Sequence, residues 1–239
     1  MIYFKYFNIT IINRSYFTQR YLTVERSNEF YPFSKNQVSL RMGKLVSQSW
    51  YLRDDVVTLA QEILGKRLLT TFGGEITSGI ITEAEAYAGE TDKASHSYNG
   101  RRTARTEPMY AGGGVAYVYL CYGIHHLFNI VTNVRDVPHA ILIRTVHPEK
   151  GIELMQQRRN HNGSLSKLTA GPGTVSQALG IRTQHTGMSL RTGEIRIEET
   201  GISIAPENII ASPRVGVDYA GDHALLPWRF RVKAGGLRI

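Results

Sequence analysis

The chain has 239 residues, of which 42% are hydrophobic and 20% charged, and its formal net charge at pH 7 is +8. This composition is too apolar for a disordered or low-complexity chain, and the length fits one domain with an extension or two small domains. The single cysteine, Cys121, excludes an intramolecular disulfide and a cysteine-rich zinc site, and no apolar run approaches the ~18 residues of a membrane span.

Residues 1–49 differ in composition from the rest of the chain. They hold ten of the 23 aromatic residues without a helical or strand period, and seven basic against two acidic residues give them a charge of +5, which leaves +3 for residues 50–239. They lack the apolar run and the small-residue cleavage site of a secretory signal. We interpret residues 1–49 as a disordered or loosely attached N-terminal extension, or as sequence ahead of a true start at Met42, and residues 50–239 as the functional domain.

After residue 50 the sequence predicts hairpins and helices without regular alternation of strand and helix, which indicates an α+β fold. Caps and glycine stops define the helices, and turn residues define the strands. The predicted helices are 56–64, capped by Asp54 or Asp55 and ended by Gly65, a helix opened by His147-Pro148, and 174–179, ended by Gly180. The predicted strands are a hairpin of 67–72 and 77–87, then 115–122, 128–134, 140–146, 194–198, 202–204 and 230–232.

The segment from Glu83 to Tyr87 is the first candidate for chemistry. Alternate residues of a strand share a face, so Glu83, Glu85 and Tyr87 lie together and Thr82, Ala84 and Ala86 face the other way. Two carboxylates beside an aromatic, next to a glycine-rich loop, suit acid–base chemistry. The ordinary alternative is a solvent-facing strand edge.

The polar loop 89–105 that follows contains His96 and three arginines. Arg101, Arg102 and Arg105 form the best local phosphate-binding feature of the chain. A solvated charge cluster is the alternative.

Tyrosines dominate the next strand, 115–122. Tyr117, Tyr119 and Cys121 share one face, whereas Tyr122 falls at the turn before Gly123 and is expected to point outward. Tyrosine rings stack on nucleobases and attract cationic rings, although an aromatic core strand would look the same. His125 and His126 are adjacent and would diverge on a strand, so we predict no metal site.

Eight short motifs then occur in one order, and together they resemble the alkyladenine (3-methyladenine) DNA glycosylase family over about residues 50–233. The motifs are Ile81-Thr-Glu-Ala-Glu-Ala-Tyr-Ala-Gly89, Ala94-Ser-His-Ser97, Gly100-Arg-Arg-Thr103, Ala116-Tyr-Val-Tyr-Leu-Cys-Tyr-Gly123, Asn129, Ile141-Leu-Ile-Arg144, Leu168-Thr-Ala-Gly-Pro-Gly173 and Arg214-Val-Gly-Val217. Two departures stand out. Ala111-Gly-Gly-Gly114 stands where the family often has a proline-containing turn, and we expect this change to loosen the approach to Tyr117. The second departure is beside Arg105, where Ala104 and Thr106 replace patterns that are common in the family.

The resemblance implies a compact single domain around a curved antiparallel sheet with peripheral helices, without metal or organic cofactor. It implies a monofunctional enzyme that flips alkylated or deaminated purines out of duplex DNA and hydrolyses the N-glycosidic bond, leaving an abasic site. The implied roles are general base for Glu85, water holding for Arg144 and a backbone carbonyl of the 214–217 segment such as that of Val215, base-pocket walls for Tyr87, His96 and Tyr119, exclusion of guanine for Asn129, and the DNA wedge for Tyr122.

The implied partner is double-stranded DNA with damaged purines, and we expect Arg101, Arg102 and Arg105 to contact its backbone. The resemblance implies that the protein binds DNA as a monomer and does not bind a membrane. We expect a bacterial cytosolic or a eukaryotic nuclear protein and not a secreted one. One alternative is a non-catalytic module that binds single-stranded nucleic acid on its 117–122 tyrosines. Another is a helix-hairpin-helix glycosylase built on residues 170–179, which needs a catalytic aspartate soon afterwards. Between Gly173 and Asp218, however, all the acidic residues are glutamates.

Overall fold

The folded unit begins earlier in the chain than its sequence pattern indicates. The structure, a computed structural model, describes residues 43–237. Most of the predicted extension, residues 1–42, therefore lies outside the described residues. Its last part, residues 43–49, belongs to the folded unit, because Leu45 forms a bridge with Glu198 and Val46 is buried.

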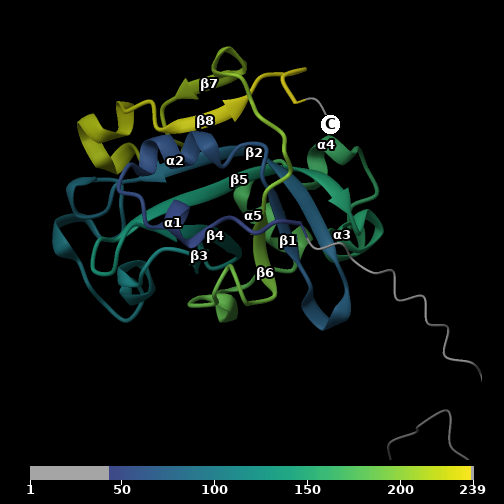
Figure 1. The fold of residues 1–239 in the computed structure, drawn as a ribbon, viewed down its shortest axis with the longest axis horizontal. Helices are drawn as coiled ribbons and strands as arrows, with labels where there is room; N and C mark the ends of the chain where they lie inside the picture. The colour runs from purple at the N-terminus through teal and green to yellow at the C-terminus, as the bar shows by residue number, and fades with distance from the viewer. Residues whose placement is uncertain (1–42, 238–239) are drawn as a thin grey trace, which may run out of the picture. The chain divides into compact units, whose positions relative to one another are not determined.

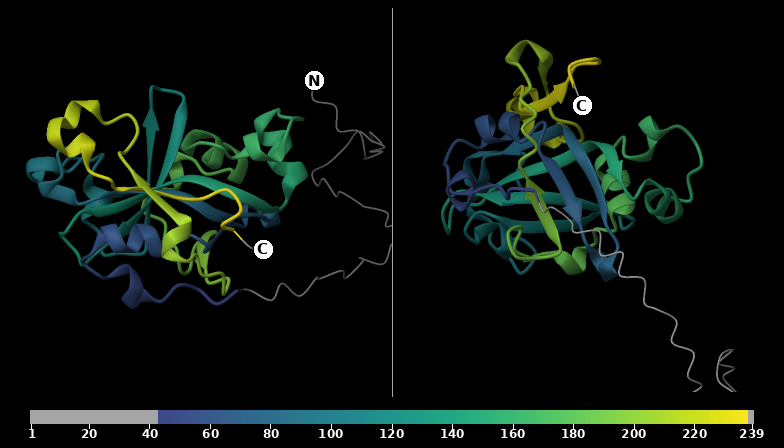
Figure 2. Two further views of the ribbon diagram at one scale, coloured as in Figure 1. Left: turned by 90° about the horizontal axis from the view of Figure 1, so that it is seen from above. Right: turned by 45° about the vertical axis from the view of Figure 1, so that its right-hand side comes forward.

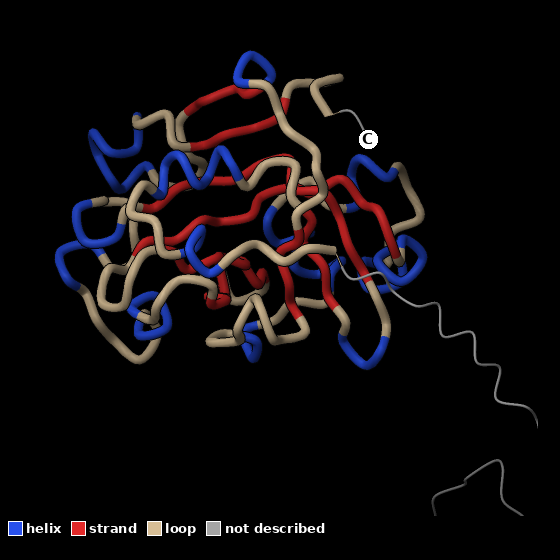
Figure 3. Tube along the Cα trace, in the orientation of Figure 1, coloured by secondary structure: helices blue, strands red, loops and turns tan. Residues whose placement is uncertain are grey.

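One antiparallel sheet organises the described chain and confirms the α+β class (Figure 1). Its order is β3-β4-β5-β2-β1-β6, and β8 pairs with both β2 and β7. Strands occupy the middle of the unit and helices its periphery (Figure 3). The strands are β1 (Arg67–Thr70), β2 (Thr77–Tyr87), β3 (Val115–Cys121), β4 (His125–Thr132), β5 (His139–Lys150), β6 (Ile195–Glu198), β7 (Ile209–Ser212) and β8 (Arg229–Val232).

β2 is the strand that positions the candidate carboxylates. It pairs with β5 along one side, while its other side pairs first with β1 and then with β8. Its register against β5 shifts on both sides of Glu83, and such irregularities bend a strand and re-aim its side chains. Ala84 and Ala86 pack into the main core, so the predicted division of this strand into two faces is confirmed.

The helices form where local capping signals predict them. α2 (Val56–Glu62) starts at Asp55, whose carboxylate accepts the Thr58 N–H, and α5 (Pro172–Leu179) starts with proline and ends at Gly180 with φ 73°. α2 packs against β2 and β5, and α5 packs against β4 and β5. Within residues 43–237, no helix has the length and apolarity needed to cross a membrane. The remaining helices are α1 (Gln48–Tyr51), α3 (Ile152–Arg159) and α4 (Leu165–Leu168).

The predicted helix through Ile152, Leu154 and Met155 is present as α3, but its predicted start at His147-Pro148 is wrong. β5 continues to Lys150, and α3 begins after Gly151, which has φ 69°. Pro148 pairs with Gly79 of β2, beyond the part of β5 that pairs with β4. The missing N–H of proline therefore removes no ladder bond on the β4 side, as at a sheet edge.

The predicted strand 202–204 is also wrong, and β7 was not predicted. Ile204 packs against the core and the Ile202 carbonyl lies close to Gly65, but neither belongs to a strand. Ile202 and Ile204 alternate with polar residues because one side of this segment packs against the protein, but the segment pairs with no neighbouring strand.

Gly113 and Gly114 are closely packed, so the expectation that the segment 111–114 loosens the approach to Tyr117 is wrong. Gly113 donates its N–H to the Asn133 carbonyl at 2.8 Å, and Gly114 donates to the Val131 carbonyl at 2.9 Å. A Cβ atom on Gly113 would lie 2.3 Å from the carbonyl oxygen of Tyr51. Glycine here permits close backbone approach.

Gly113→Ala is therefore expected to lower the free energy of unfolding by about 1–3 kcal/mol, the usual cost of forcing atoms into a packed site. Gly112→Ala is the matched control, because its Cβ would meet nothing within 4 Å. Denaturant unfolding of both variants measures the difference. Equal midpoints for the two would show that the packing around Gly113 relaxes freely.

Candidate active site

A cavity of about 380 Å³ opens between the β3–β4 hairpin, the loop after β2 and the segment before β8. The start of α5 closes another side, since Gly171, Pro172 and Gly173 line the cavity. The glycine-rich segment thus forms a cavity wall at a helix start. Seven of the predicted site residues line this one cavity: Tyr87, His96, Tyr119, Tyr122, Asn129, Arg144 and Val215.

Glu85 lies behind that lining, with its side chain fully buried. Its Oε1 accepts the Val215 N–H at 2.8 Å and pairs with the Arg144 guanidinium at 3.2 Å, while its Oε2 accepts the Tyr87 hydroxyl at 2.8 Å. A carboxylate has about four lone-pair positions, so these three partners leave room for one more donor. The arrangement can hold a water molecule and accept its proton.

The pKa of Glu85 is raised above 4.5, and burial is the main cause. The positive charge of Arg144 and the hydrogen bonds from Val215 and Tyr87 oppose that rise, whereas the nearby Glu83 carboxylate adds to it. A raised pKa brings a carboxylate closer to the range in which a general base works at neutral pH.

Arg144 connects the two carboxylates of β2. Its Nε donates to Glu83 at 3.2 Å, and its guanidinium also contacts Glu85. Glu83 is buried as well and receives a second cation, Arg229, at 3.3 Å. The two acids are thus compensated by two arginines, which excludes the alternative of a solvent-facing strand edge.

Aromatic rings form one wall of the cavity. His96 packs edge-to-face on Tyr119 with ring centroids 4.5 Å apart, and its Nδ1 lies 2.9 Å from the Tyr117 hydroxyl. Burial, assisted by Arg105 and Arg101, lowers the pKa of His96 to about 4, so the ring is neutral at neutral pH. Burial also raises the pKa of Tyr117 to about 12. The wall is therefore aromatic and uncharged.

Asn129 and Tyr122 occupy opposite situations in the β3–β4 hairpin. Asn129 is buried, and its amide nitrogen donates to the carbonyls of Tyr117 and Leu127, which holds the side chain in one orientation. Tyr122 is 89% exposed at the turn, with φ 50°, and Ile124 beside it is 72% exposed. The hairpin stands out from the rest of the unit (Figure 2). The outward placement predicted for Tyr122 is found.

The three loop arginines differ in their surroundings. Arg102 is held by Glu107 and Asp136, both at 2.7 Å, and lies over the Tyr110 ring. Arg105 lies over the Tyr119 ring at the cavity wall, with 5.4 Å between its guanidinium carbon and the ring centroid. The two carboxylates thus compensate the charge of Arg102.

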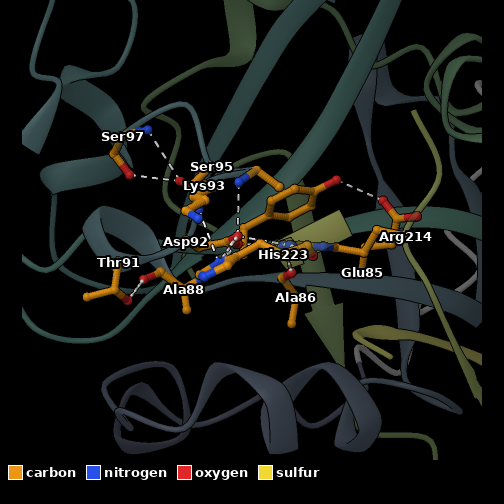
Figure 4. A network of polar contacts seen from close by, with 12 residues as sticks. Glu85, Ala86, Ala88, Thr91, Asp92, Lys93, Ser95, Ser97, Arg214 and His223 are labelled. Carbon is orange, nitrogen blue, oxygen red and sulfur yellow. Dashed lines mark hydrogen bonds and ion pairs between the residues drawn. The ribbon is translucent and has the colours of Figure 1, made fainter. Parts of the chain in front are cut away.

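A buried ion pair beside Glu85 was missed by the sequence reasoning. Asp92 and Arg214 are both fully buried at their side chains and form a two-point contact (Figure 4). Asp92 sits in a loop that looks polar, and its partner lies 122 residues further along the chain. No local pattern marks such a pair.

Within the described chain, no group of three or more His, Cys, Asp or Glu side chains is placed to hold a metal ion.

The model of the methylpurine-DNA glycosylase family matches residues 49–235. A Chlamydia felis protein named "Putative 3-methyladenine DNA glycosylase" is 49% identical over 187 residues, covering 78% of this chain and 95% of its own length. A Bacillus mycoides protein of the same name is 42% identical over 188 residues, covering 75% and 92%.

Proposed function

Because the chain belongs to the methylpurine-DNA glycosylase family and is a DNA glycosylase of DNA repair, we propose that it extrudes a damaged purine into the 380 Å³ cavity and hydrolyses its N-glycosidic bond. The observation that carries this mechanism is the buried Glu85 carboxylate, held by Arg144, Tyr87 and the Val215 N–H directly behind an aromatic cavity. Family membership favours an enzyme over a non-catalytic module.

In the proposed reaction, Glu85 takes a proton from a water molecule that Arg144 and the Val215 segment help to hold. The water oxygen bonds to C1′ of the sugar as the C1′–N bond breaks, and the bond electrons leave with the base. A positioned water and a nearby carboxylate supply orientation and stabilise the developing positive charge on the sugar. The products are a free base and an abasic site.

We propose alkylated purines as the preferred lesions, with deaminated purines as slower substrates. Alkylation at N3 or N7 makes the ring cationic, so it leaves more readily and is attracted to the faces of Tyr87 and Tyr119. Neutral lesions need protonation of the leaving base, and His96, with a pKa of about 4, is uncharged at neutral pH. Asn129 is proposed to exclude guanine's exocyclic amine.

Extrusion requires a group to fill the gap in the duplex, and we assign this to Tyr122, which is exposed at the cavity mouth. Base flipping costs a few kcal/mol and is cheapest for lesions that pair poorly. Arg101, Arg102 and Arg105 are proposed to hold the DNA backbone. We propose that the enzyme acts as a monomer in the bacterial cytosol or the nucleus.

A monofunctional reaction is supported by the cavity lining. A lyase step needs an amine nucleophile, and among the described residues that line the cavity there is no lysine. The test is to incubate duplexes carrying 3-methyladenine, 7-methylguanine, hypoxanthine or ethenoadenine with the protein and to analyse them before and after alkali. We expect base release with strand cleavage only after alkali, fastest for the cationic lesions. Cleavage without alkali would contradict the monofunctional mechanism, and faster release of hypoxanthine would contradict the proposed preference.

A further inference from the structure

The buried pair of Asp92 and Arg214 contacts several segments that surround Glu85. The Arg214 guanidinium donates to the Ala86 carbonyl at 2.9 Å and to the His223 carbonyl at 3.1 Å, in addition to Asp92. Asp92 accepts the N–H groups of Ala88 at 3.2 Å and Ala94 at 3.0 Å. The pair thus ties together the end of β2, the loop after it and the segment after residue 213.

Both hydrogen bonds that reach Glu85 from neutral donors originate on these tied segments. Val215, which donates its N–H to Glu85, directly follows Arg214 in the chain. Tyr87, which donates its hydroxyl, has its ring against the Arg214 guanidinium at 4.8 Å, and Trp228 lies against the same guanidinium at 5.1 Å. A shift of Arg214 would therefore displace both donors at once.

A buried ion pair is weak support for stability, because desolvation consumes most of its attraction and apolar residues often fill such a site equally well. Two planar groups with fixed hydrogen bonds do, however, define orientation. We propose that Arg214 and Asp92 are positioning residues of the glycosylase: their pair holds the Val215 N–H and the Tyr87 hydroxyl on Glu85 and so keeps this carboxylate a competent base. The inference rests on the proposed role of Glu85.

The proposal makes a claim about pH, since Glu85 works only when it is ionised. The groups facing Glu85 are Arg144 from β5, Glu83 and Tyr87 from β2, Tyr119 from β3, and Val215 with Tyr219 from the segment before β8. The hydrogen bonds from Val215 and Tyr87 hold the pKa of Glu85 down against burial. Weakening them raises that pKa, and activity is then lost at a higher pH as the solution is acidified.

Arg214→Lys keeps the charge but loses the planar contacts. We expect its acid midpoint for single-turnover release of 7-methylguanine to rise by about one pH unit, the effect of losing one hydrogen bond to a charged group. At pH 8 the rate should also fall about 10- to 100-fold through misplacement of the water. The substrate is the same in every sample, so a change in the pH–rate profile is caused by the substitution in the protein.

Trp228 offers a second variant, because it lies outside the cavity lining and its ring lies against the Arg214 guanidinium at 5.1 Å. Its other contact near Glu85, from the Ala86 N–H to the Trp228 carbonyl, is made by the backbone and is kept when the side chain is replaced. Trp228→Leu should move the midpoint in the same direction by about half a pH unit, and Trp228→Phe, which keeps a ring, should restore most of the wild-type profile. If Arg214→Lys shows no cooperative melting, the two Trp228 variants decide.

Lys93→Ala is the matched control. It removes the exposed Lys93–Asp222 pair, 2.7 Å long, which joins the same two segments at the surface without touching Glu85 or the buried pair. Its profile should equal that of the wild type. Wild-type midpoints in Arg214→Lys and Trp228→Leu, with only a lower melting temperature, would overturn the proposal. Glu85→Gln measured alongside separates the two hypotheses, because wild-type release in that variant would instead remove the proposed role of Glu85.

Discussion

Replacing Glu85 with glutamine is expected to lower the single-turnover rate of base release by about 10²–10⁴-fold, the usual contribution of a general base. The amide still fills the buried site, and its oxygen still accepts the Val215 N–H. Its NH2 group replaces the oxygen that accepts the Tyr87 hydroxyl, and the amide takes no proton from water. Binding of lesion DNA should remain nearly intact, because Glu85 is fully buried behind the cavity lining. Quench-flow release assays and titration of a labelled lesion duplex measure the two quantities.

Glu83→Gln is the matched comparison on the same strand face. Glu83 contacts Arg144 and Arg229 but not the Val215 N–H, so its loss should disturb the orientation of Arg144 and reduce the rate less than Glu85→Gln does. In the wild type, activity should fall as the pH falls through the pKa of Glu85, which lies above 4.5. Wild-type turnover in Glu85→Gln, or a larger loss in Glu83→Gln, would show that Glu85 is not the general base.

Tyr122→Ala is expected to weaken extrusion of the lesion by a few kcal/mol, the cost of unstacking one base step without a filler. Its folding stability should change little, because the side chain is 89% exposed. Tyr51 provides the contrast: it is fully buried, and Tyr51→Ala should lower the free energy of unfolding by about 3–5 kcal/mol, as large aromatic core deletions do.

The measurement combines thermal melting of Tyr122→Ala with its release rate on duplex and on single-stranded lesion DNA. A wedge matters only where a partner strand must be separated from the flipped base, so the loss should be confined to the duplex. An equal loss on both substrates, or a large fall in melting temperature, would show that Tyr122 packs against the protein. Ile124, exposed on the same turn, would then be the next candidate wedge.

Features set by near neighbours in the chain could be predicted from the sequence. The cap at Asp55, the stop at Gly180 and the β1–β2 hairpin each depend on residues a few positions apart, and all three are present. The division of β2 into a core face and a site face followed from its alternation alone. The grouping of Glu85 and Arg144 in one site was predicted from the family resemblance, because neither composition nor local spacing predicts that these two residues lie together.

The features that the sequence did not predict depend on residues that are distant in the chain. Whether Pro148 continues a strand is decided by β2, some seventy residues earlier, and by how far β4 extends along β5. The surroundings of Arg102 likewise depend on Asp136, 34 residues later, as well as on the nearby Glu107. The pair of Asp92 and Arg214 is the extreme case, because two single charges so far apart in the chain carry no pattern.

The long reach of the contacts around Glu85 has a consequence for synthesis on the ribosome. β2 is made early, but the Val215 N–H that reaches Glu85 lies 130 residues later, and β8 follows that segment. At about 5–20 residues per second, the carboxylate waits roughly 6–26 s for these partners. A nascent chain can pair β1 with β2, whereas the reaction centre closes only when its last tenth emerges. A nascent chain that has not yet reached Val215 is therefore expected to lack base-release activity.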